Sequence, residues 1–207
     1  MNKRYLLLAG IIIALGVGIL LMPAKDTAKQ TQPELLLAAI DDPSRFLTTD
    51  DITDRLVKKD PALILIDVRP ESQFRAFSIP GAINIPADSL LSASAQEILN
   101  QKAMDKVFYS NADVTSDQAW IICKRMKLQR IYVMQGGVNA WFNTIVKAEK
   151  PAETASAKAL ALYQFRIAAC QYFYGSPEMA AAPKAETVKK KVNVVKKASG
   201  ASSGGGC

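Results

Sequence analysis

Short apolar runs alternate with helix-like stretches between residues 46 and 149. Four runs have the length and the flanking turn residues of buried strands, and they cover 62–67, 81–86, 106–110 and 130–134. The stretches between them carry helical spacing or helix-capping residues, and they cover 48–59, 71–77, 95–103, 116–128 and 136–149. Apolar strands that alternate with helices predict an α/β domain over 46–149 with a central parallel sheet covered on both faces.

The N-terminus carries an uncharged apolar run at residues 5–22, preceded by Lys3 and Arg4. A membrane-spanning helix needs about 20 such residues, so we predict a single-pass transmembrane anchor within 1–24. The positive-inside rule then puts the rest of the chain outside the cytoplasm, in a bacterial periplasm or at the cell exterior. A cleaved signal peptide is the alternative. Residues 25–45, with their prolines and polar positions, are predicted to be a linker.

The C-terminal part separates into a helix-like stretch over 150–179 and a tail over 180–207. The helix has an apolar stripe of Leu160, Tyr163, Ile167, Cys170 and Phe173. We predict that it packs on the domain, with partner binding as the alternative. The Lys-, Gly- and Ser-rich tail is predicted to be disordered. Its lysines form either a solvated tail or a tether to an acidic partner or surface.

The charge and the composition exclude several classes of function. The chain has 26 Lys and Arg residues against 19 Asp and Glu, and the positive excess lies at the two ends. The domain is therefore not predicted to bind nucleic acid. The absence of histidine excludes histidine-based triads and histidine metal ligands. The cysteines at 123, 170 and 207 are far apart, so no metal and no cofactor are predicted.

Three stretches in order resemble a rhodanese domain, which belongs to the sulfurtransferase superfamily. They are "LILIDVRPESQFRAFSIPGAINIP", "FYSNADVTSDQAW" and "IYVMQGGVNAW", within about residues 46–149. The resemblance implies a three-layer α/β domain with a central parallel sheet. The residues that match family motifs are Asp67, Arg69, Pro80, Gly81, Gly136, Gly137 and Trp141. We expect Asp67 and Arg69 to make structural contacts.

The resemblance also implies that the loop after the third predicted strand is the active-site loop. Its residues are Ser110, Asn111, Ala112, Asp113, Val114, Thr115 and Ser116. In the family this loop begins with a cysteine whose thiolate becomes a persulfide, and here Ser110 has that position. Asp113 replaces the family's glycine and Thr115 its arginine. Ser78 stands where the family often carries histidine. Serine cannot hold a transferable sulfur, so we predict a degenerate site.

Other chemistry-bearing residues near the loop have structural explanations. Cys123 falls on the apolar face of its predicted helix and is expected in the core. Asp113 and Asp117 are expected to be charges at a helix N-terminus.

These observations predict a membrane-anchored binding or scaffolding module without sulfurtransferase activity, whose protein partner is unknown. The alternative function is a sulfurtransferase or sulfur carrier that uses the thiol of Cys207 in place of a loop cysteine. Two further interpretations of Cys207 stay open. It forms an intermolecular disulfide, or it is an appended handle for expression or conjugation.

Overall fold

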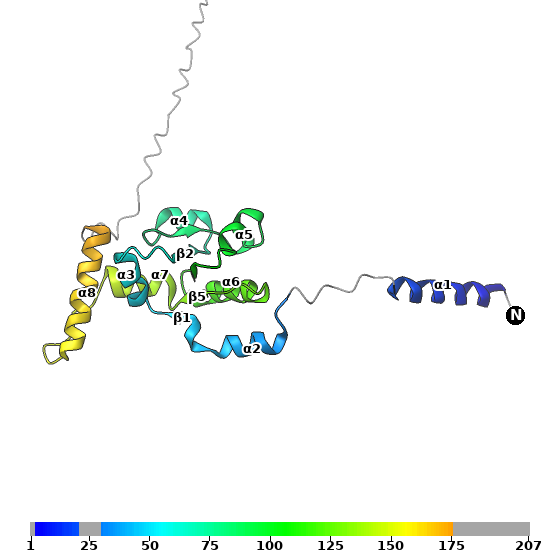
Figure 1. The fold of residues 1–207 in the computed structure, drawn as a ribbon, viewed down its shortest axis with the longest axis horizontal. Coiled ribbons are helices and arrows are strands. Elements are labelled where there is room, and N and C mark those ends of the chain that lie inside the picture. Colours follow the sequence, from blue (N-terminus) through cyan, green and yellow to red (C-terminus); the bar gives the residue numbers. More distant parts are fainter. Residues whose placement is uncertain (1–2, 21–29, 176–207) are drawn as a thin grey trace, which may run out of the picture.

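Five parallel strands form the sheet at the centre of the molecule. The computed structural model describes residues 3–20 and 30–175, and Figure 1 shows the arrangement of the elements. The strand order is β1-β5-β4-β2-β3, with the bounds Phe46–Leu47, Leu63–Asp67, Ile83–Asn84, Asp105–Tyr109 and Ile131–Met134 for β1 to β5. The predicted parallel sheet is confirmed, and four of its strands lie where the sequence indicated.

Helices cover both faces of this sheet. On one face lie α2 (Pro33–Asp41), α5 (Ala93–Leu99) and α6 (Asp113–Arg125), and on the other lie α3 (Thr49–Val57), α7 (Gly137–Trp141) and α8 (Ala157–Tyr174). Shorter elements join them, namely α4 (Glu71–Ala76), the 3₁₀ helices η2 (Pro43–Arg45) and η3 (Ala87–Ser89), and the π-helix η4 (Phe142–Val146). Figure 1 shows α8 beside α3 and α7, at the side of the domain away from α2.

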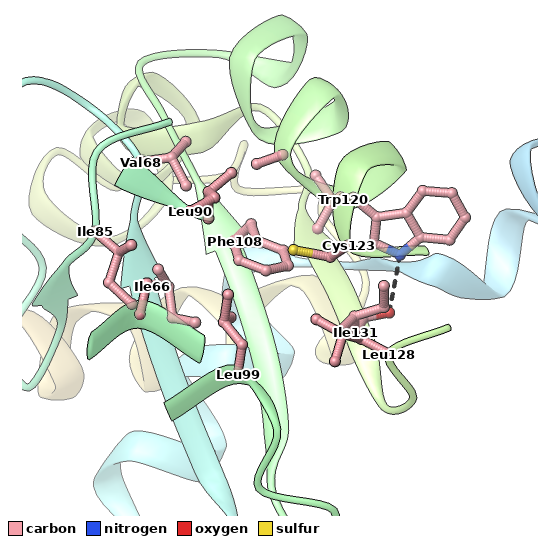
Figure 2. Close-up of a cluster of buried hydrophobic side chains, with 13 residues drawn as sticks. Ile66, Val68, Ile85, Leu90, Leu99, Phe108, Trp120, Cys123, Leu128 and Ile131 are labelled. Carbon is pink, nitrogen blue, oxygen red and sulfur yellow. Dashed lines mark hydrogen bonds between the residues drawn. The ribbon is translucent and has the colours of Figure 1, made fainter. Parts of the chain in front are cut away.

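The strand side chains divide between two cores because successive residues of a strand point to opposite faces. Val107 and Tyr109 of β4 pack under α3 and α7, whereas Phe108 packs under α5 and α6. Figure 2 shows this second core, in which the indole of Trp120 donates a hydrogen bond of 2.9 Å to the carbonyl of Ile131. Apolar residues on both faces are what a sheet covered on both sides requires.

The segment expected to be a linker is partly helical. Within 25–45 the structure has α2 and η2, and Pro33 occupies the first turn of α2, where its missing N–H costs nothing. Ala39 and Ile40 pack against the α5–α6 core. Residues 33–41 of the predicted linker are therefore helical, and the side chains of Ala39 and Ile40 lie against the domain. The boundary between linker and domain stays a prediction.

The first helix, α1 (Lys3–Leu20), does not support the predicted anchor over residues 5–22. Across the two described ranges, no helix combines the length and the apolar character that crossing a membrane requires. A helix of 18 residues rises about 27 Å, against about 30 Å for the hydrocarbon core of a bilayer. Two of those residues are the charged Lys3 and Arg4. The extracytoplasmic location depended on this span and stays a prediction.

Helix α8 docks on the domain through its second half. Arg166 forms a two-pronged ion pair with Asp50 of α3, at 2.6 and 2.8 Å, and Trp141 donates a hydrogen bond of 3.1 Å to the hydroxyl of Tyr174. Cys170 is 1% exposed, whereas Leu160 is 40% exposed. The predicted packing is confirmed for this half alone. The tail over 180–207 lies outside the described residues.

Candidate functional site

The loop that the sequence singled out opens a pocket at the carboxyl end of the sheet. Ser110 directly follows β4, and Asp113 begins α6. The pocket has a volume of about 270 Å³, and its wall combines residues from the β2–α4 segment with the loop: Arg69, Pro70, Gln73, Ser110, Asn111, Ala112, Val114 and Thr115. Ligands of open α/β sheets bind at this end of the strands. The structure thus brings five of the seven predicted loop residues into one pocket wall. Asp113 does not line the pocket, and Ser116 is fully buried.

The Gly136–Gly137 turn holds the loop in place. The N–H of Val138 donates to the carbonyl of Ser110 at 2.8 Å, and the N–H of Asn139 donates to the carbonyl of Asn111 at 3.1 Å. Gly137 has φ +57°, and a Cβ at this position would lie 2.3 Å from the carbonyl oxygen of Ser110. Only glycine permits this approach, so the turn and the loop form one rigid unit.

Ser110 is turned into the protein rather than toward the pocket opening. It is 3% exposed, and its hydroxyl donates a hydrogen bond of 2.5 Å to the carbonyl of Ala112. The hydroxyl of Ser116 donates to the carbonyl of Asp113 at 2.9 Å. Within the described ranges no basic side chain hydrogen-bonds to the Ser110 hydroxyl, so nothing there activates it as a nucleophile.

Asp113 connects the first turn of α6 to the glycine turn. Its Oδ1 accepts a hydrogen bond of 2.5 Å from the N–H of Gly136. The predicted role as a charge at a helix N-terminus is confirmed for Asp113, which lies in the first turn of α6. It is wrong for Asp117, which pairs with the nearly buried Arg45 at 2.6 Å. Helix α6 begins earlier than expected, and this leaves Asp117 beyond its first turn.

The positive charge in the pocket wall comes from Arg69, at the end of β2. Arg69 and Asp67 form a buried ion pair of 2.6 Å, with side chains that are 6% and 0% exposed. The same guanidinium donates to Oδ1 of Asn111 at 3.2 Å and to the carbonyl of Phe77 at 2.7 Å. The expected structural role of the pair is confirmed. The contact from Arg69 to the loop was not predicted, and the sole sequence signal for it is the place of Arg69 just after a strand.

The two cysteines of the described chain lie away from this pocket. Cys123 is fully buried in the α5–α6 core, where its sulfur points toward Phe108 (Figure 2). Burial raises the pKa of the Cys123 thiol to about 12, and it also raises the pKa of Cys170. The core position predicted for Cys123 is confirmed, while Cys207 lies outside the described residues. No group of three or more Cys, Asp or Glu side chains within the described ranges could hold a metal ion.

The remaining motif residues support the frame rather than line the pocket. Pro80 and Gly81 lie in the turn before β3, where Gly81 has φ +80°. Trp141 is fully buried beneath α8. Ser78 is half-buried and does not line the pocket. These motif residues therefore contribute to the turns and the packing of the domain and not to the pocket wall.

Comparisons with known proteins find similarities to this region. Residues 48–144 match the family model of the rhodanese-like domain. The adenylyltransferase and sulfurtransferase of Meyerozyma guilliermondii is 28% identical over 95 residues, which are 40% of this chain and 20% of that protein. The chain thus spans about a fifth of the curated relative that it matches.

Solved structures of low identity are similar to the same region. A rhodanese-related protein of Thermoplasma volcanium is 22% identical with a TM-score of 0.41, over 47% of this chain and 90% of that one. A protein of unknown function from Rhodopseudomonas palustris, described as a possible tyrosine phosphatase, is 24% identical with a TM-score of 0.46, over 64% of this chain and 99% of that one. These are similarities of fold.

Proposed function

Starting from a rhodanese-like domain at residues 48–144, we propose that this protein is a binding module that does not transfer sulfur. The observation that carries the proposal is the hydroxyl of Ser110, just before α6. It donates a hydrogen bond to the carbonyl of Ala112 in its own loop. Sulfur transfer by this fold needs a thiolate at that point. Serine is far less acidic than cysteine, and no base among the described residues hydrogen-bonds to the Ser110 hydroxyl.

The other thiols of the described chain cannot replace the missing one. Cys123 and Cys170 are buried, and their raised pKa values keep them protonated near neutral pH. Thiolates, not thiols, are the nucleophiles of sulfur chemistry. The alternative function therefore rests on Cys207 alone, which would have to reach the pocket from the end of the chain.

The pocket keeps features that suit contact with a partner protein. The first N–H groups of a helix have no partner inside the helix, and the N-cap residue Ala112 offers no side chain to accept from them. These donors stand beside the guanidinium of Arg69 and the Asn111 amide. At the rim, Val114 is 70% exposed. Free donors beside an exposed apolar side chain favour a peptide carbonyl or carboxylate as the bound group.

The first test is sulfur transfer from thiosulfate to cyanide by the full chain. We expect no turnover above the uncatalysed rate for the wild type and for Cys207→Ser. Turnover by the wild type that disappears in Cys207→Ser would establish the tail thiol as the sulfur carrier. Turnover that survives in Cys207→Ser would refute the loss of activity altogether.

The second test concerns the partner. A photo-crosslinking amino acid at position 114 should give one adduct of defined mass in cells that make the protein. The same group at Lys158, which is exposed on α8, serves as the control. Equal adducts from both positions would refute the loop as the contact surface.

A further inference from the structure

A second pocket lies at the opposite end of the sheet, between the ends of α5 and α6. Its volume is about 300 Å³. Three lysines, Lys102, Lys106 and Lys127, line it together with the apolar side chains of Leu99, Met126 and Leu128. Lys106 precedes Ser110 by four residues along β4, a separation of about 13 Å. This pocket is therefore distinct from the one at the degenerate loop.

Lys106 is a buried ammonium group that pairs with no carboxylate among the described residues. Its side chain is 1% exposed, and its Nζ donates one hydrogen bond, of 2.9 Å, to the carbonyl of Gln101. The neighbouring carboxylate, Asp105, is already bound by Arg55 at 2.8 Å and by Arg130 at 2.7 Å. Buried charges are normally paired, so the position of Lys106 in a pocket wall needs an explanation.

The electrostatic surroundings of Lys106 disfavour the charged form of its amine. Burial is the main cause that lowers the pKa of the Lys106 amine, and the nearby Arg130 adds to it. Asp105 and Cys123 act in the opposite direction but do not outweigh burial. An anion in the pocket would offset this cost, since an opposite charge within a few ångströms favours the ammonium form.

The rest of the wall defines which anion would fit. None of the residues that line the pocket carries a carboxylate. Lys102 and Lys127 add positive charge at the exposed rim, while Leu99 and Leu128 belong to the apolar core. A volume of about 300 Å³ is at the lower end of the range for small-molecule sites.

We propose that this pocket binds a small oxyanion with an apolar body, of the size of an aromatic acid. The carboxylate or phosphate group would pair with Lys106 and contact the rim lysines, and the apolar body would lie against Leu99, Met126 and Leu128. The hydrogen bond to the carbonyl of Gln101, just after the end of α5, uses one of the three N–H groups of the Lys106 ammonium. It does not account for Lys102 or for the pocket.

The test is a titration of the ¹⁵N-labelled full chain, followed by NMR, with benzoate and with its neutral analogue benzamide. We expect benzoate to shift the amide signals of residues 99–102 and 126–129, with benzamide at least about tenfold weaker. Phenyl phosphate in a parallel titration distinguishes the two headgroups. Failure of both anions to shift these signals, or equal binding of benzamide, would overturn the proposal. So would shifts centred on Ser110 and Asn111.

Variants test whether Lys106 makes the ion pair. Lys106→Met keeps the apolar stem, and we expect it to weaken benzoate binding at least about tenfold. Lys102→Gln, at the exposed rim, should weaken benzoate binding about twofold to threefold. This substitution leaves the buried core of the domain unchanged. Lys158→Gln on α8 is the matched control and should change nothing. Unchanged affinity in both pocket variants would refute the assignment.

Discussion

The close approach between Gly137 and the loop makes Gly137→Ala a sharp test of how the pocket is built. The substituted Cβ would lie 2.3 Å from the carbonyl oxygen of Ser110 and 2.8 Å from the carbonyl carbon of Asn111, so the backbone of the loop has to move. A positive φ costs a non-glycine residue about 1–2 kcal/mol. Loss of the two hydrogen bonds from α7 to the loop adds about 1 kcal/mol each. We therefore expect the free energy of unfolding to fall by about 3–4 kcal/mol.

Gly81→Ala is the matched control for this substitution. Gly81 also has a positive φ, of +80°, but the nearest atom to its Cβ would be a side-chain carbon of Leu56 at 3.8 Å. Only the conformational cost applies, so the loss should be about 1 kcal/mol. Urea unfolding of both variants, followed by circular dichroism, measures the difference. Equal losses would show that the loop does not depend on the glycine turn and would refute the role of Gly137.

Four further predictions concern the buried charges, the thiols and α8. Arg69→Gln should lower the free energy of unfolding by about 3–5 kcal/mol because it leaves Asp67 buried without its partner. Lys58→Gln, in an exposed pair, should lower it by less than about 0.5 kcal/mol. Similar losses of the two variants in urea unfolding would contradict the role of the buried pair. Native protein treated with iodoacetamide at pH 8 should be alkylated at Cys207 and not at Cys123, whose pKa is about 12, and mass spectrometry of peptides checks this. Because the folded state holds the Cys123 proton to a higher pH than the unfolded chain, stability should fall as pH rises from about 9 toward 12, and Cys123→Ala should reduce that slope. Arg166→Gln should lower the free energy of unfolding by about 1 kcal/mol. It should also increase the rate of amide hydrogen exchange in α8 more than in α6. An unchanged exchange rate in α8 would refute the docking role of the ion pair with Asp50.

The sequence predicted the strands and helices whose own residues define them. β2 and β4 are apolar runs between turn residues, and Thr48 and Asp51 form the capping box that begins α3. β1 has only Phe46 and Leu47, so no periodicity could reveal it. It exists because β5 pairs with it. α2 was missed for a related reason, since its stability comes from packing against a distant core.

The candidate site was predictable in its position and not in its contacts. The spacing of the motifs located Ser110 and the glycine turn, because these are local in the sequence. The hydrogen bond from Arg69 to Asn111 joins residues 42 positions apart, and the bond from Gly136 to Asp113 joins residues 23 apart. The partners of such side chains depend on the sheet order, which the alternation of strands and helices leaves open. The lysine pocket depends on tertiary packing in the same way.

The order in which the sheet assembles has a consequence for synthesis of the chain. β1 pairs with β5 alone among the described strands, and Asp50 of α3 meets Arg166, which follows it by 116 residues. At about 5–20 residues per second, the ribosome delivers that partner roughly 6–23 seconds after Asp50. Until β5 has been made the nascent chain carries an unpaired strand, and until α8 has been made it carries an uncovered helix face. A chaperone that holds such segments would therefore be expected to raise the yield of this protein more than that of one whose first strand pairs with the second.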